Sequence, residues 1–176
     1  DGLKMIEEDT EGFLSAEEVT YPPEIHVASE LFEASMKFLL GHELGHHFLK
    51  HTSLNGKNIT SKFIPEDVTS NQLHLDEFAA DNFAFDLVVI QGKKEENKIF
   101  LLAPLMVILM LALFDNVPEK SSPTHPSLKD RYLNLLSKVS EIDEEVACEL
   151  QVFFEYTALW IKMRLPHGYW KIDWWE

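Results

Sequence analysis

The sequence predicts a mainly α, helical domain. Apolar residues recur every three or four positions over long stretches, and turn-forming Pro, Gly, Asn and Ser residues separate these stretches. The 176 residues are 45% hydrophobic, enough to bury a core without disulfides. We therefore expect one domain over residues 1–176, with its core at 24–165 and an aromatic tail at 166–176. A small β element near the N-terminus is the one exception considered, since Phe13, Leu14, Val19 and Tyr21 could form a short strand.

The first half of the chain predicts two helices joined by a loop. Apolar spacing indicates a helix over residues 24–51, with Pro23 suited to its first turn. Residues 52–72 carry loop-forming residue types. A second helix is expected over 74–91, with Gly92 as its stop.

Residues 99–114 are continuously apolar and include Pro104. Sixteen helical residues span roughly 24 Å, which is short of the ~30 Å hydrocarbon core of a bilayer. We expect a buried central helix, with a membrane-associated segment as the alternative.

Two further helices are expected near the C-terminus. Pro126 at a first helical position predicts His125 as the cap residue of one, and Asp143 is expected to cap the other, which runs to about Leu165. Cys148 is interpreted as a small core residue of this last helix. Its inward face is expected to comprise Val146, Leu150, Phe153, Phe154, Leu159 and Trp160.

The charge balance limits the classes of partner. The formal net charge is −15, from 15 basic and 30 acidic residues. Such a chain is unsuited to a nucleic-acid backbone or an anionic membrane surface. A single cysteine and no visible signal peptide favour a cytoplasmic location. The tail, with Trp170, Trp174 and Trp175, either packs on the body or binds a protein partner.

The strongest chemical signal is His42-Glu43-Leu44-Gly45-His46, a His-Glu-x-x-His pattern inside the first expected helix. Residues four apart share a helix face, so His42 and His46 can bind one Zn²⁺ ion. Glu43 points elsewhere around the helix and suits a general base that takes a proton from a metal-activated water. Gly45 leaves room for another element to approach closely.

A catalytic zinc needs a third protein ligand, and the second expected helix offers one in Glu77. Asp81 lies one helical turn further along. It is placed to accept a hydrogen bond from the ring N–H of a ligand histidine, which fixes the orientation of the imidazole.

These blocks together resemble the gluzincin peptidases of the HtpX heat-shock protease and CAAX prenyl protease family. The resemblance spans roughly residues 24–140 and is carried by His42-Glu43-Leu44-Gly45-His46, His51, Glu77-x-x-Ala80-Asp81, Thr124-His125-Pro126 and Arg131. It implies a zincin-like domain in which His42, His46 and Glu77 bind zinc, Glu43 is the general base and Asp81 orients a ligand. It also implies that His125 reaches into the site and that Arg131 orders the acidic groups.

Chemistry suggests a role for His125 and Arg131 independently. His125 could donate a hydrogen bond to the oxyanion formed during peptide hydrolysis, or it could simply cap a helix. Arg131 could form a bidentate pair with Glu77 or with Asp81. Of the other histidines, His51 is the one expected to matter most.

The sequence thus predicts a zinc-dependent endopeptidase acting on a peptide or protein substrate. Two alternatives remain open. One is a catalytically silent zincin-like domain that regulates or binds a partner. The other is a membrane-associated peptidase whose segment 99–114 lies in lipid.

Overall fold

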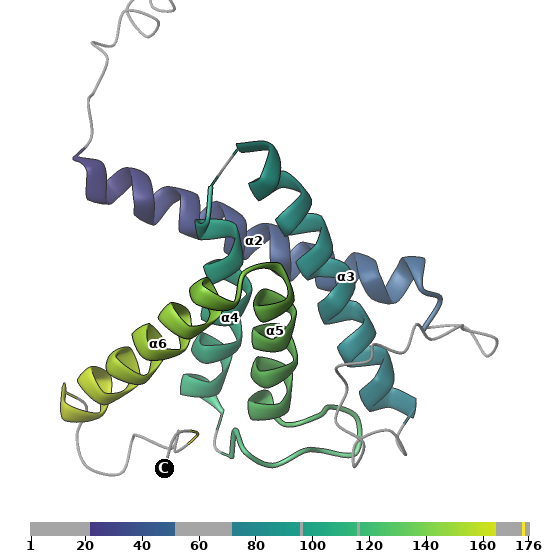
Figure 1. Ribbon diagram of the computed structural model, residues 1–176. Helices are drawn as coiled ribbons and strands as arrows, with labels where there is room; N and C mark the ends of the chain where they lie inside the picture. Colours follow the sequence, from purple (N-terminus) through teal and green to yellow (C-terminus); the bar gives the residue numbers. More distant parts are fainter. Residues whose placement is uncertain (1–21, 52–71, 96, 116, 165–173, 175–176) are drawn as a thin grey trace, which may run out of the picture.

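The computed structural model describes residues 22–51, 72–95, 97–115, 117–164 and 174, which form a helical domain (Figure 1). Its helices are α2 (Pro23–Phe48), α3 (Gln72–Glu95), α4 (Ile99–Phe114), α5 (Leu128–Ile142) and α6 (Glu144–Arg164). No strand occurs within these ranges, so the mainly α prediction is confirmed. The β element considered near the N-terminus lies outside the described residues.

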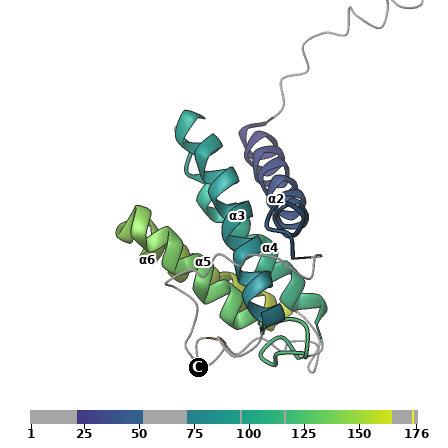
Figure 2. The same ribbon diagram turned by 90° about the vertical axis from the view of Figure 1, so that its right-hand side faces the viewer.

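Helices α2 and α3 cross in close contact (Figures 1 and 2). Their backbones can approach because glycines on α2 face alanines on α3. A Cβ built at Gly45 would lie 3.0 Å from the Ala80 Cα, and one at Gly41 would lie 3.2 Å from the Ala84 Cα. The expected role of Gly45 in leaving room for a neighbouring element is therefore confirmed, and α2 is held against α3 at the level of the histidine motif.

Helix α4 is the buried centre of the domain, as predicted. It packs against α2, α3 and α5, and Leu105, Ile108 and Leu109 are among its fully buried side chains. Among the described residues, no helix is both long enough and apolar enough to span a bilayer.

Helices α5 and α6 complete the core. Tyr132 of α5 packs edge-on against Phe154 of α6, with ring centroids 5.6 Å apart. Trp174 of the C-terminal tail lies 5.3 Å from the Tyr132 ring, so this part of the tail packs on the body. Helix α6 packs on α5, on the side away from α2 (Figure 2).

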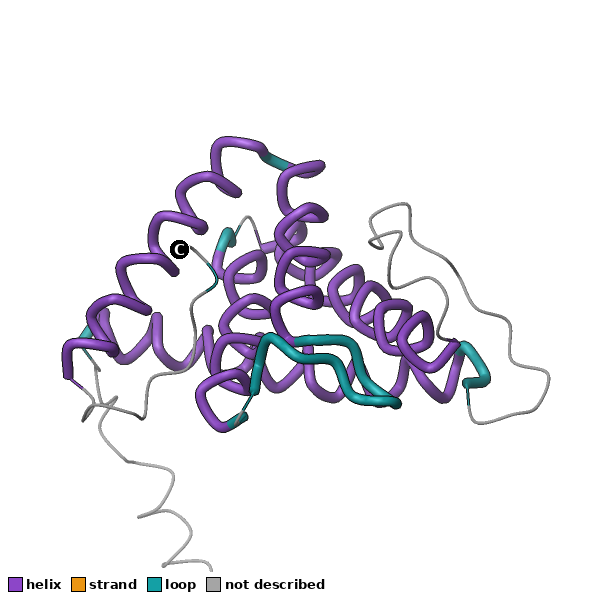
Figure 3. The backbone as a smooth tube through the Cα atoms, turned by 90° about the horizontal axis from the view of Figure 1, so that it is seen from below, coloured by secondary structure: helices purple, strands orange, loops and turns teal. Residues whose placement is uncertain are grey.

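The connection between α4 and α5 doubles back on itself (Figure 3). The backbone N–H of Leu128 donates to the Pro118 carbonyl at 3.0 Å, and that of Ser122 donates to the His125 carbonyl at 2.9 Å. The predicted cap residue of α5 is wrong. Ser127, not His125, caps the helix, and its side chain accepts a hydrogen bond from the Asp130 backbone N–H. Asp143 does cap α6, through the backbone N–H of Val146.

Two other helix ends differ from the prediction. Helix α3 continues through Gly92 to Glu95. A Cβ at Gly92 would lie 2.6 Å from the Phe100 Cβ, so the glycine serves close packing against α4 rather than termination. Helix α2 ends at Phe48, and Lys50 adopts a left-handed φ of 62°, which turns the chain before His51.

The expected inner face of α6 is partly wrong. Val146 and Phe154 are buried, but Phe153, Leu159 and Trp160 are about half exposed. Ala147 and Ala158 take their places in the interior. Cys148 is exposed rather than part of the core. Each of these differences arises because α6 packs mainly on α5 and therefore buries only a narrow stripe of its surface.

Candidate metal centre and active site

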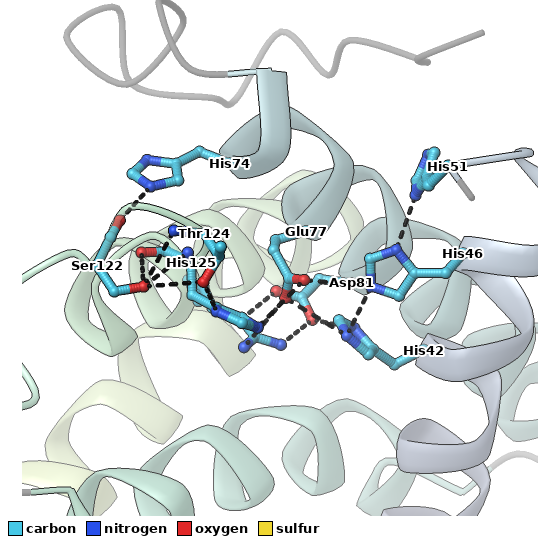
Figure 4. Close-up of polar contacts among 10 residues, drawn as sticks. His42, His46, His51, His74, Glu77, Asp81, Ser122, Thr124 and His125 are labelled. Carbon is cyan, nitrogen blue, oxygen red and sulfur yellow. Dashed lines mark hydrogen bonds and ion pairs between the residues drawn. The ribbon is translucent and has the colours of Figure 1, made fainter. Parts of the chain in front are cut away.

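The crossing of α2 and α3 brings four predicted site residues together (Figure 4). His42 and His46, one turn apart on α2, face Glu77 and Asp81, one turn apart on α3. Because Gly45 contacts the Ala80 backbone, the two pairs meet where the helices are closest. Glu77 and Asp81 are buried, and His42 and His46 are partly buried.

Four polar atoms converge at the centre of this group, namely two imidazole nitrogens and both oxygens of one carboxylate. The Nε2 atoms of His42 and His46 lie 3.2 Å apart. Glu77 Oε2 lies 3.5 Å from His42 Nε2, and Glu77 Oε1 lies 3.3 Å from His46 Nε2. A tetrahedral Zn²⁺ with ligand distances of about 2.0–2.1 Å places neighbouring ligand atoms roughly 3.3–3.4 Å apart. Each of the three measured distances is therefore close to the spacing between neighbouring ligand atoms of a tetrahedral zinc site, with the two oxygens of Glu77 each facing one histidine.

Hydrogen bonding indicates that His42 offers a lone pair to this centre. Its Nδ1 lies 2.9 Å from Asp81 Oδ1, and a carboxylate can only accept, so Nδ1 carries the proton. In the neutral ring, Nε2 is then an acceptor. Arg131 holds Asp81 from the other side, with Nε 2.8 Å from Oδ2 and Nη2 2.7 Å from Oδ1. Of the two pairings considered for Arg131, the bidentate one is made with Asp81, while Glu77 lies 3.6 Å away.

His46 has an equivalent support. Its Nδ1 lies 2.9 Å from the Nδ1 of His51, so one of these nitrogens donates and the other accepts. The buried Nε2 of His51 lies 3.9 Å from Asp76 Oδ1. A proton on His51 Nε2 would face Asp76 and leave His51 Nδ1 to accept from His46. His46 Nε2 then presents a lone pair toward His42 and Glu77. Two imidazole nitrogens and a carboxylate at these distances need a positive charge among them, supplied either by a proton on His46 Nε2 or by a metal ion, so this donor set fits a bound metal.

The charges of the cluster shift the pKa values of its members. Burial alone would raise the pKa of Asp81, but the charge of Arg131 and the bond from His42 hold it at about 2. Burial would also raise the pKa of Glu77, yet the contacts with His46 and Arg131 lower it below its usual value. The contact with Glu77 raises the pKa of His46. Both acids are therefore carboxylates at neutral pH, as metal binding and ligand orientation require.

The loop between α4 and α5 delivers His125 to the edge of this cluster. His125 Nε2 lies 3.6 Å from Glu77 Oε1, and its side chain is 59% exposed. Its Nδ1 lies 2.7 Å from Thr124 Oγ1, which restricts the ring. His74, at the start of α3, lies with its Nε2 2.8 Å from the Ser122 carbonyl oxygen and so connects the loop to α3. Since Ser127 caps α5, His125 has no capping role.

Glu43 lies on α2 next to His42 and is exposed. Glu77 raises the pKa of His46 and Asp81 raises that of Arg131, and the charge of Glu43 adds a smaller effect in the same direction to each. The carboxylate is therefore close enough to act electrostatically on the cluster while remaining open to water.

The comparison with protein families gives the wider context. The model of the Peptidase U49 family matches residues 12–151. The chain belongs to the Peptidase U49 family. The match includes α2 to α5 and every predicted site residue, and it supports proteolytic function for this U49 chain. The match supports a peptidase family, but it does not show membership of the HtpX and CAAX protease family that the motifs resemble. No curated protein and no solved structure matches the chain.

Two contacts of this U49 peptidase were not predicted from the sequence: that of His74 with the Ser122 carbonyl oxygen and that of His51 with Asp76. The interaction of His51 with His46 could have been suspected only from the five-residue separation, which does not place two side chains on one helix face. It arises here because the chain turns at Lys50.

Proposed function

We propose that this U49 peptidase is a zinc-dependent endopeptidase whose metal ligands are His42, His46 and Glu77. The observation that supports this most directly is the approach of two imidazole nitrogens to each other, at 3.2 Å, and to the two oxygens of one carboxylate, at 3.3 and 3.5 Å. Among the described residues this is also the set of His, Cys, Asp and Glu side chains able to hold a metal ion together. Three protein ligands leave a position open, as catalytic zinc sites require.

Bound there, Zn²⁺ would supply Lewis acidity toward the substrate carbonyl and its attacking water. The residues of the chain supply the rest. Glu43 is exposed beside His42 and would accept the proton of the attacking water, then return it to the leaving amine. His125, on the opposite side of Glu77, would donate a hydrogen bond to the oxyanion. Arg131 and Asp81 keep His42 in its ligand orientation.

The variant Glu43→Gln tests this assignment. It should retain one zinc per chain, because Glu43 is not a ligand, and lose at least about 100-fold in the rate of hydrolysis. The assay would follow cleavage of denatured casein and of peptides blocked at both ends, with zinc measured by elemental analysis. Internal cleavage of blocked peptides by the wild type is required for an endopeptidase.

Leu44→Ala, an exposed neighbour of Glu43 on α2, is the matched control and should cleave normally. Normal cleavage by Glu43→Gln would exclude the proposed base. A wild type that binds zinc but cleaves neither substrate would favour the silent zincin-like domain.

A further inference from the structure

An apolar groove runs between α2 and α4 on the exposed side of the domain. Its volume is about 440 Å³, within the ~300–1,000 Å³ range of ligand pockets. Apart from Ser35, its lining residues are all apolar. Those that the argument uses are Phe32, Met36 and Leu39 of α2 and Met110, Leu111 and Phe114 of α4.

These side chains are unusually open to solvent for their size. Phe32 is 68% exposed and Phe114 is 82% exposed. Met36, Leu39 and Met110 are each exposed by more than a third. Contiguous exposed apolar surface costs free energy in water and marks a binding site in many soluble proteins.

The groove is continuous with the candidate active site in two ways. On α2, Leu39 precedes His42 by three residues and Glu43 by four, so the lining face of the helix runs directly into the motif. On α4, Leu111 and Phe114 also line a second pocket, of about 390 Å³, whose other walls include His125 and Arg131. One surface therefore leads from the groove past Leu111 and Phe114 to His125.

We propose that this groove binds a large apolar side chain of the peptide substrate, next to the scissile bond. The inference rests on the proposed peptidase function and specifies the class of substrate. A peptide whose carbonyl lies between Glu43 and His125 would extend along this surface. Leu39 lies one helical turn before Glu43, and Phe114 lines the same pocket as His125, so both are placed to contact its side chain. The lining offers that side chain no charged partner.

The methionines of the groove predict that it accepts several different large apolar side chains. Met36, Met106 and Met110 all line the groove, and methionine side chains adapt to ligands of different shape. We expect leucine, methionine and phenylalanine to be accepted alike. Alanine should be disfavoured roughly 10- to 100-fold, since it fills little of the groove, and charged residues more strongly.

The first test measures binding and does not depend on turnover. Two fluorescent decapeptides, blocked at both ends and differing only in a central leucine or alanine, would be titrated into zinc-loaded Glu43→Gln protein. Leucine should bind at least about 10-fold more tightly. Met36→Lys and Met110→Lys, one on each wall, should each abolish that difference. Ile25→Lys adds the same charge at a half-exposed apolar position of α2 outside the groove and should preserve it.

The second test reads specificity. Wild type and the same three lysine variants, with Glu43 intact, would digest a blocked peptide library, and mass spectrometry would identify the cleaved bonds. Large apolar residues should dominate one position beside the cleaved bond in the wild type and in Ile25→Lys, but not in the groove variants. Thermal unfolding and zinc content would verify that each variant is folded.

The outcomes separate the two proposals. Leucine-dependent binding without any cleavage would support the groove and reject the peptidase mechanism. Cleavage with equal binding of both peptides, or with a preference that Met36→Lys and Met110→Lys leave intact, would overturn the groove assignment alone. Concentration-dependent dimerisation that the groove variants abolish, with peptide binding unchanged, would assign the groove to a second copy and also overturn it.

Discussion

Two acids one turn apart on α3 have different tasks because their neighbours differ. Glu77 faces the imidazoles of His42 and His46, whereas Asp81 is fully buried between His42 and Arg131. A buried charge is tolerated only when it is paired, and the bidentate contact with Arg131 provides that pairing. Asp81 therefore orients His42 and pairs with Arg131, and it does not belong to the group of side chains that could hold a metal ion.

This environment predicts an acid-dependent loss of stability. Asp81 has a pKa of about 2 in the folded chain against an ordinary 3.8, so its ionised form favours the folded state. The contribution, about 2 kcal/mol, is complete above pH 4–5 and disappears as the pH falls toward 2. In urea unfolding of metal-free protein, the stability gap between wild type and Asp81→Asn should narrow as the pH falls below about 4. A gap that does not narrow in this range would refute the assignment.

His51 predicts a different effect, on metal affinity. It contacts His46 Nδ1 as Asp81 contacts His42 Nδ1, and groups in this position hold a ligand imidazole in its binding orientation. His51→Ala should weaken zinc binding about 10- to 100-fold in competition with a chromophoric chelator. His47→Ala removes an exposed histidine of α2 and should leave the affinity unchanged. Equal zinc affinity in His51→Ala and wild type would show that His51 does not orient His46 for metal binding.

The sequence identifies the candidate metal ligands but not all of the residues that hold them in position. Spacing of three or four residues within a helix predicts which side chains share a face, and this was enough for His42 with His46 and for Glu77 with Asp81. The contact of His51 depends on a left-handed turn at Lys50, and that of His74 depends on a loop 48 residues away. No local pattern encodes contacts of this kind.

The close contact of Gly45 with Ala80 sets the distance between α2 and α3 at the candidate metal site. A methyl group at Gly45 would lie 3.0 Å from the Ala80 Cα and 3.2 Å from its carbonyl oxygen, both backbone atoms. Gly45→Ala should therefore push the helices apart at a cost of about 1–3 kcal/mol, offset by up to ~1 kcal/mol of helix propensity. Thermal unfolding and zinc titration should both show the loss.

Gly41→Ala provides the graded comparison. Its nearest contacts, Ala84 Cα and Cβ at 3.2 Å, lie one turn further from His46. It should reduce stability with less effect on zinc affinity than Gly45→Ala. Unchanged affinity in Gly45→Ala would mean that close helix contact does not set the distance between Glu77 and the histidines.

The existence and type of the helices followed from apolar periodicity, whereas their ends did not. Glycine often ends a helix, but it also allows close packing. At Gly92 the second role applies, because the Phe100 side chain leaves no room for a Cβ atom. Ser127 outcompetes His125 as the cap of α5 because a hydroxyl accepts the orphan N–H of Asp130. Tertiary contacts of this kind override local signals, which is also why the apolar α6 residues Phe153 and Trp160 are exposed.

The domain as a whole gathers its candidate ligands from two helices that are far apart along the chain. A metal that binds His42, His46 and Glu77 joins α2 to α3 directly, and the unfolded chain offers no such arrangement. Binding therefore adds to folding stability by mass action, by about 2.7 kcal/mol at a free zinc concentration 100-fold above Kd. For a chain of 176 residues this corresponds to a rise in Tm of roughly 5–10 °C.

We expect this rise in wild type on adding Zn²⁺ to chelator-treated protein, together with one zinc per chain by elemental analysis. Glu43→Gln keeps all three ligands and should show the same rise, whereas Glu77→Ala should show almost none and retain no stoichiometric zinc. Because Glu77→Ala also removes a carboxylate beside Arg131, its metal-free Tm must be measured separately, and only the increment due to zinc counts. An equal increment in Glu77→Ala and wild type would place the metal elsewhere. No increment and no zinc in the wild type would leave the His-Glu-x-x-His motif without a metal-binding role and the proposed hydrolytic mechanism without its Lewis acid.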